Sequence, residues 1–354
     1  MGIFVDAAYA GSRGVHLSSS NNVSINNLPD SFYQQAASQE AAGQPISILQ
    51  KVPNPFTGIT TVSGLNPTTN LTIPAGQLDR PYPEYTGLSL VGDGCCGSNY
   101  NSFQLTVTKR FHNGGSFLAA YTNAKLLSNT DTLTTWLESG VGSPQDWNNL
   151  KAERSLSSQD VSQRLVISYV YDLPFGHGQR YMSDASGVVN KVVSGWGIDG
   201  VTSFQKGFPL PISFGGSNQI SQAGFTQNFQ LRPNVTPGCN KGAAHTTVPG
   251  TNNIVWFNAS CFVAPAEWGF GDESRVDATL RGSGINNWDI ALFKTTNFGP
   301  EDKLGFQFRA EFFNAFNRVQ FGPPGTALGS GSFGIVSSQL NNPRLIQFGL
   351  KFLF

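Results

Sequence analysis

The last nine residues of the chain, 346–354, alternate between two kinds of side chain. One side of an extended strand would carry Ile346, Phe348, Leu350, Phe352 and Phe354, and the other would carry Gln347, Gly349, Lys351 and Leu353. Successive side chains of a strand point to opposite faces, so the pattern predicts a strand with one strongly apolar face. Chain termini are usually frayed and polar. This terminal strand must instead pair with a neighbour and lie against an apolar environment.

Two architectures supply such an environment. In a soluble β-sandwich, the final strand would be buried against a second sheet. In an outer-membrane β-barrel, lipid would cover the apolar face, and closure of the sheet would pair the strand. The terminal strand alone does not separate these two alternatives, so the composition and the loop pattern of the whole chain have to decide.

The composition favours the barrel. Charged residues make up 12% of the 354 residues, and aromatic residues make up another 12%, with 27 Phe. The usual charged share is ~25%. The mean hydropathy is nevertheless −0.17, because Asn, Gln, Ser and Thr are abundant. A membrane barrel needs an uncharged lipid face together with a polar lumen and polar loops. The 22 basic and 22 acidic residues cancel, which argues against a nucleic-acid partner.

Alternating apolar and polar residues predict a series of strands. They fall at residues 3–10, 100–111, from 116 onward, 164–174, 194–205, 286–296, 303–316 and 346–354. Residues 208–214 are predicted to extend the sheet as an edge or bent piece, since Pro209 and Pro211 exclude a central strand. Short turns at residues 112–115 and 299–302 contrast with long polar loops at 18–86, 128–163, 215–283 and 317–341. Short turns on one side and long loops on the other are typical of outer-membrane barrels.

No stretch approaches the ~18 consecutive apolar residues that a membrane-spanning helix needs, so no such helix is predicted. The first ten residues lack a basic region and alternate as a strand does, so they do not form a secretory signal. We expect that this sequence is the later part of a longer protein.

The four cysteines form two groups. Cys239 and Cys261 lie in a polar stretch, and a disulfide between them would suit an oxidising compartment. The adjacent Cys95 and Cys96 would form a strained vicinal bridge or stay reduced. Scattered His residues and the lack of a Cys-x-x-Cys motif argue against a metal site.

Several short stretches together resemble the C-terminal part of a TonB-dependent outer-membrane receptor, in particular the Oar-like receptors common in acidobacterial genomes. The matching stretches are residues 8–17, 98–105, 171–176, 256–262, 287–290, 308–317 and the terminal Phe354. Each is weak alone, but their order is specific, and they are spread over almost all of the chain.

This resemblance implies an all-β fold, namely an antiparallel transmembrane β-barrel with long extracellular loops. The implied barrel has 22 strands, whereas about eight to ten can be counted here, so residues 1–354 would be the C-terminal portion of it. An N-terminal plug, a TonB-contacting segment and an N-terminal regulatory-like domain would be absent from this sequence. The implied function is import of a large or scarce solute with energy delivered through TonB.

The resemblance also implies partners. Lipid of the outer membrane would surround the strands, and the terminal strand resembles the signal read by the barrel-assembly machinery. Gly349, Phe352 and Phe354 would carry that signal, although Phe348 stands where a polar residue is often found. The solute is not specified by the sequence.

No constellation of side chains points to catalysis, so we expect a protein that is not an enzyme and needs no cofactor. Gln307, Arg309 and Glu311 share the polar side of the best-alternating strand and are predicted to face the lumen. They would touch the solute or the plug, or simply form a salt-linked pair in the wall. Trp136, Trp147 and Trp256 would stack on a carbohydrate or chelate, or simply pack the loops together.

Two other functions remain open at this stage. One is a self-contained porin-like or adhesin-like barrel without energy coupling, and the other is a secreted β-sandwich that binds glycans. A plug and a TonB-contacting segment encoded upstream of Met1 would select the receptor. A protein that is soluble and monodisperse without detergent would select the sandwich.

Overall fold

The structure, a computed structural model, describes residues 2–19, 22–59, 65, 71–111, 114–130, 143–242, 245–298 and 304–354. Its main feature is one antiparallel sheet in which each long strand pairs with the next along the chain. The long strands are β1 (Ile3–Leu17), β6 (Cys96–Arg110), β7 (Ser116–Ser128), β9 (Gln163–Asp172), β10 (Trp196–Gln205), β15 (Ile285–Phe298), β16 (Leu304–Phe313) and β19 (Leu345–Leu353). The all-β, antiparallel fold class predicted from the sequence is confirmed.

The long strands have the length that a membrane requires. The shortest, β19, has 9 residues, and the longest, β1 and β6, have 15. A tilted strand of ~9–11 residues crosses the hydrocarbon core of a bilayer. In the described part of the chain, β1 and β19 form the two edges of the sheet, and no pairing joins them.

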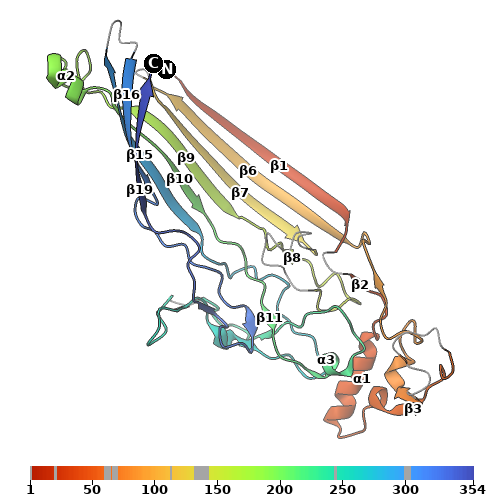
Figure 1. Ribbon diagram of the computed structural model, residues 1–354. Coiled ribbons are helices and arrows are strands. Elements are labelled where there is room, and N and C mark those ends of the chain that lie inside the picture. The colour runs from red at the N-terminus through yellow and green to blue at the C-terminus, as the bar shows by residue number, and fades with distance from the viewer. Residues whose placement is uncertain are drawn as a thin grey trace.

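The two ends of the sheet differ (Figure 1). The turn end holds both chain termini, the facing ends of β6 and β7 and of β15 and β16, and the helix α2 (Gly187–Val193) between β9 and β10. The loop end holds the described residues of the long segments 18–95, 129–162, 206–284 and 314–344. This asymmetry is the one predicted from the sequence.

The described residues at the loop end form short elements of their own. The helical ones are α1 (Asp30–Ala41), η1 (Ser47–Leu49), η2 (Ala75–Gln77), α3 (Gln219–Ala223) and η3 (Ala259–Cys261). The short strands are β2 (Val23–Ser24), β3 (Lys51–Pro53), β4 (Thr72–Pro74), β5 (Ser89–Leu90), β8 (Ser155–Leu156), β11 (Ser213–Phe214), β12 (Asn234–Val235), β13 (Ile254–Val255), β14 (Phe262–Val263), β17 (Ala327–Leu328) and β18 (Ile335–Val336). None of the helices among the described residues is long and apolar enough to cross a membrane.

The buried core of the molecule lies in these segments rather than on the sheet. One cluster joins segments 206–284 and 314–344 around Phe257, which is fully buried. A second cluster joins segments 18–95 and 206–284 around Tyr33 and Ile220. Burial of apolar side chains is the main stabilising force in folding. The long loops therefore pack into one cap at the loop end.

Three sequence-based predictions of local structure were wrong. The first strand does not end at residue 10 but continues to Leu17, because Gly11 and Gly14 stay in register with β6. Segment 18–86 is not loop with at most short strands, because it contains α1, whose buried residues are Tyr33 and Ala36. Because most of its residues are polar and exposed, the sequence of α1 shows no clear helical spacing of apolar residues.

Residues 208–214 do not extend the main sheet either. Leu210 and Ile212 are buried in the loop-end core, and only Ser213–Phe214 forms a strand, which pairs in parallel with β17. The two prolines lack the N–H groups that a ladder needs, so burial of the apolar side chains in the cap decides where this segment goes.

Candidate functional site

The alternation of the strands stays in phase across the whole sheet and produces one continuous apolar face. For example, Ile198 lies opposite Leu292, Leu292 opposite Ala310, and Ala310 opposite Phe348. Phe348 and Leu350 are 69% and 71% exposed. Exposed apolar patches of this extent mark an interaction surface, here one with lipid.

Aromatic side chains gather near both ends of this apolar face. Near the turn end lie Phe111, Phe117, Tyr171, Trp196, Phe298, Phe306 and Phe352. Near the loop end lie Tyr9, Phe103, Phe204, Trp288 and Phe316. Lys109 and Lys294 at the turn end place their ammonium groups over Phe111 and Trp196. Two aromatic girdles that flank an apolar band are typical of transmembrane barrels. The sequence alone does not reveal them, because the register of the sheet is needed to align these residues.

The opposite face of the sheet, the polar face, carries charged and polar side chains together with apolar ones such as Val170 and Val201. Arg309 Nη2 lies 3.0 Å from Asp199 Oδ2, and Arg309 Nε lies 2.9 Å from Glu311 Oε1. Gln307 donates a hydrogen bond to Thr295. The structure thus brings together the three residues predicted to face a lumen, and it adds Asp199, which sequence reasoning missed because it lies 110 residues away.

The residues predicted to carry the assembly signal lie on β19, an edge strand. Gly349 pairs with Arg309, and Phe352 packs beside Phe306 with ring centroids 5.3 Å apart. Phe354 is 97% exposed at the turn end. The outer edge of this strand is accessible to another protein strand among the residues described.

Buried ion pairs hold the cap together. Arg232 binds Glu153 through two hydrogen bonds of 2.7 and 3.1 Å, and both side chains are almost fully buried. Lys241 binds Glu273 at 2.7 Å and Asp277 at 2.5 Å. Burial alone would lower the pKa of Lys241, but the hydrogen bonds to these two carboxylates raise it. The Arg232–Glu153 pair therefore joins segments 129–162 and 206–284, and the Lys241 pairs stabilise segment 206–284 internally.

Both cysteine pairs form disulfides. The Cys239–Cys261 bridge joins Cα atoms 5.5 Å apart, and Cys261 is fully buried in the cap core. Cys95 and Cys96 are also bridged, where β6 begins. No group of three or more His, Cys, Asp or Glu side chains that could hold a metal occurs in the described ranges.

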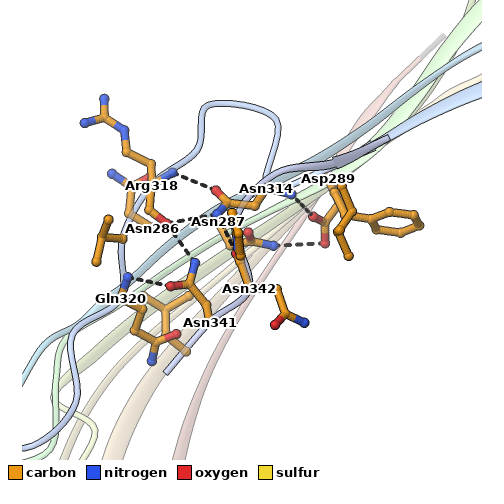
Figure 2. A pocket seen from close by; sticks show the side chains of 13 residues that line it. Asn286, Asn287, Asp289, Asn314, Arg318, Gln320, Asn341 and Asn342 are labelled. Atoms are coloured by element: carbon orange, nitrogen blue, oxygen red, sulfur yellow. Dashed lines mark hydrogen bonds between the residues drawn. The ribbon is translucent and has the colours of Figure 1, made fainter. Parts of the chain in front are cut away.

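A first cavity, the rim cavity, has a volume of about 430 Å³ and lies where β15, β16 and β19 leave the sheet (Figure 2). Its polar side chains are largely occupied by one another and by backbone. Asn314 donates to the carbonyls of Arg318 and Asn342 and accepts from the N–H of Arg318. Asp289 accepts from the backbone N–H of Asn314. The rim cavity is therefore a junction that anchors segment 314–344 to the sheet.

A second cavity, the loop cavity, has a volume of about 550 Å³ and lies inside the cap. It is lined by Asp30, Tyr33, Gln34, Gln145, Asp146, Asn149, Ala152, Glu153, Arg232, Trp268, Gly269, Phe270, Gly271, Asp272, Glu273 and Ser274. Burial, and then the neighbouring Asp30, raise the pKa of Asp146 to about 7. Burial raises the pKa of Tyr33 to about 12. Sequence reasoning missed this cavity, since its walls come from segments far apart in the chain.

Of the tryptophans singled out from the sequence, Trp147 and Trp256 line neither cavity. Trp147 donates to the carbonyl of Asn228, and Trp256 donates to that of Arg281 and stacks on His245 at 4.2 Å. Both are buried and pack the cap. Trp136 lies outside the described residues. The tryptophan at the loop cavity is Trp268, whose sequence context carries no distinguishing signal.

The match to a family model agrees with this geometry. A family model described as an outer membrane beta barrel domain matches residues 1–347. No curated protein matches the chain. Among solved structures, the outer membrane transporter YddB from Escherichia coli aligns with a TM-score of 0.41 and 7% sequence identity, over 100% of this chain and 31% of that one. The chain thus spans about a third of the length of that transporter.

Proposed function

The chain belongs to the outer membrane beta barrel domain family, and from this premise we propose that it is the C-terminal wall of a TonB-dependent receptor of the Oar-like type. The receptor would import a large or scarce solute across the outer membrane. The observation that carries the proposal is the combination of a two-faced sheet with a folded cap at one end only.

The two parts have separate physical roles. The apolar face between its aromatic girdles seals the wall against lipid. The polar face, with Asp199, Arg309 and Glu311, offers fixed charges to whatever fills the interior. A cap held by buried ion pairs and a disulfide presents a preorganised surface, which lowers the ordering cost of binding a solute.

The proposed partners follow from these surfaces. TonB would act through an N-terminal segment that this sequence does not include, and a plug would fill the interior against the polar face. The barrel-assembly machinery would read β19 through Gly349, Phe352 and Phe354. The proposed role is transport rather than catalysis.

The first experiment reads the DNA upstream of the Met1 codon and then tests TonB binding. We expect an in-frame region that encodes further strands, a plug and a TonB-contacting segment. The full-length protein in detergent should then be retained by the immobilised periplasmic domain of TonB, and deletion of the contacting segment should abolish retention.

The porin-like alternative gives the opposite result. A receptor with a plug should show no steady conductance in a planar bilayer, whereas a porin-like barrel conducts ions continuously. Continuous conductance together with a stop codon just upstream of Met1 would overturn the proposal.

A further inference from the structure

The connection between β9 and β10, residues 173–195, is much longer than a hairpin needs and contains α2. We call it the α2 segment. A hairpin turn takes about 2–5 residues, and turns on the periplasmic side of outer-membrane barrels are short. Figure 1 shows α2 standing clear of the strands at the turn end. The length of the α2 segment points to a role beyond joining two strands.

The apolar side of α2 faces away from the rest of the protein. Val188, Val189 and Val192 are 79%, 54% and 60% exposed. They share one side of the helix, because residues three and four apart are neighbours there. On the opposite side, Asn190 accepts a hydrogen bond from the backbone N–H of His177. A helix in water normally buries its apolar side and exposes its polar side. In α2 this arrangement is reversed, so its valines require an apolar environment outside the chain.

The C-terminal end of α2 is attached to the lipid-facing side of the sheet. Trp196, on the apolar face, donates a hydrogen bond from Nε1 to the carbonyl of Val192, 2.9 Å away. Lys294, opposite Trp196 in the ladder, donates to the carbonyl of Ser194. Trp196 belongs to the turn-end girdle, and aromatic girdles lie at the level of the lipid headgroups. The exposed valines therefore continue the lipid-facing surface at that level.

Other side chains of the α2 segment also suit a membrane surface. Phe175 and Tyr181 are 38% and 49% exposed, and their ring centroids lie 5.5 Å apart. The guanidinium of Arg180 lies over the Tyr181 ring. Two basic residues, Arg180 and Lys191, stand against one acidic residue, Asp184. Aromatic rings favour the headgroup region, and basic side chains extend toward lipid phosphates.

We propose that the α2 segment is an interfacial membrane anchor. The valines of α2 insert into the phospholipid leaflet at the turn end, and Arg180 and Lys191 lie at the level of the headgroup phosphates. Lipid fits this surface because it already surrounds the adjoining girdle. A helix of 7 residues is far shorter than the ~12–15 that are marginally stable in water, so adsorption to the bilayer would also stabilise α2.

The anchor would fix the depth and tilt of the sheet in the bilayer. It requires only a barrel wall in the outer membrane and is independent of energy coupling through TonB.

The test measures the depth of α2 in the full-length protein, reconstituted into nanodiscs of phosphatidylcholine and phosphatidylglycerol. Both faces of a nanodisc are open to aqueous quenchers. The four cysteines of this sequence are paired, so a fluorophore can be placed on Val188→Cys. The matched control is Asp184→Cys, at an exposed position four residues earlier.

A nitroxide on the lipid acyl chain should quench the label at position 188 at least about twofold more than at 184, because the apolar side of an interfacial helix lies ~5–10 Å below the surface. Aqueous iodide should show the reverse order.

A second substitution in the labelled protein checks the role of the valines. Val192→Asp should reduce lipid quenching at position 188, since a charge on the apolar side opposes insertion. Ser183→Asp adds the same charge outside the helix and should not reduce it. Both positions lie outside the main sheet, so the strands should stay protected from protease in either variant.

Two results would overturn the anchor. Strong iodide quenching and weak lipid quenching at position 188 would place α2 in water. Protection of position 188 from both quenchers would show that protein covers the valines, for example a second copy of the chain. Neither result bears on TonB, and failure of the protein to bind TonB would leave the anchor intact.

Discussion

Arg309 on β16 reaches across β15 to Asp199 on β10, with 3.0 Å between Nη2 and Oδ2. Beneath this bridge lies Ala291, which is opposite both Asp199 and Glu311 in the ladder and is buried. A three-strand charge bridge over a small side chain is a feature of the polar face, and it has no counterpart on the apolar face among the ion pairs described.

The bridge should contribute little to stability. Arg309 and Asp199 side chains are 31% and 24% exposed, and ion pairs open to water are worth about 0–1 kcal/mol. Arg309→Ala should therefore lower the free energy of unfolding by less than about 1 kcal/mol. Urea titration followed by tryptophan fluorescence measures this, and a loss above about 3 kcal/mol would contradict the solvated geometry.

Arg232→Ala should behave very differently. Its partner Glu153 is fully buried, and removing one member of a buried pair leaves an uncompensated charge, at a cost of about 3–5 kcal/mol. The damage should be confined to the cap, because neither residue belongs to the long strands. Limited proteolysis should cut segments 143–162 and 206–284 faster, while the strands stay protected; Arg309→Ala is the control.

The two faces of β19 predict opposite responses to the same substitution. Phe348 lies on the apolar face in the row of Leu292 and Ala310, whereas its neighbour Gln347 lies on the polar face opposite Glu311. An Arg on the lipid face near the midplane costs about 2–4 kcal/mol. Phe348→Arg should reduce the amount of folded protein in outer-membrane fractions, and Gln347→Arg should not. Similar losses for both variants would contradict the assignment of the faces.

Removing the Cys239–Cys261 disulfide should loosen the cap. A bridge that closes 22 residues of sequence separation stabilises by about 3 kcal/mol in the chain-entropy account. The double variant Cys239→Ser/Cys261→Ser should be cleaved faster between residues 236 and 262 than the parent. Adding a reductant to the parent should reproduce the effect, and an unchanged cleavage rate in both cases would refute it.

The Asp30–Asp146 pair predicts a pH dependence of the cap. The pKa of Asp146 is raised to about 7, first by burial and then by Asp30, so the folded state holds a proton that the unfolded state releases near pH 4. The contribution of protonated Asp146 to the free energy of unfolding is therefore complete below about pH 4. It declines as the pH rises to about 7 and stays at its lower value above that.

Asp146→Asn should flatten this dependence, because the amide does not titrate. Melting temperature measured from pH 4 to pH 8.5 checks it, and Asp79→Asn, at an exposed position of the same cap, is the control. A parent protein whose cap is most stable above pH 7 would contradict the sign.

The alternation of apolar and polar residues in the sequence was enough to predict the long strands of the sheet. Alternation with period 2 is a property of neighbouring residues, so β16 and β19, their apolar and polar faces, and the contrast between tight turns and long loops could all be predicted. The short matching stretches indicated an outer-membrane barrel, which the family model confirms, and the Cys pair in segment 215–283 was expected to bridge.

The rest was decided by contacts that no local pattern encodes. The register between strands aligns the aromatic girdles, and Asp199 meets Arg309 across 110 residues of sequence. Helix α1 forms because Tyr33 and Ala36 find a buried partner surface in segment 206–284, although its own period is weak. The loop cavity exists only where Asp30, Asp146 and Trp268 are brought together by the folded cap. Period 2 fixes which way a side chain points, but packing between distant segments determines what it meets.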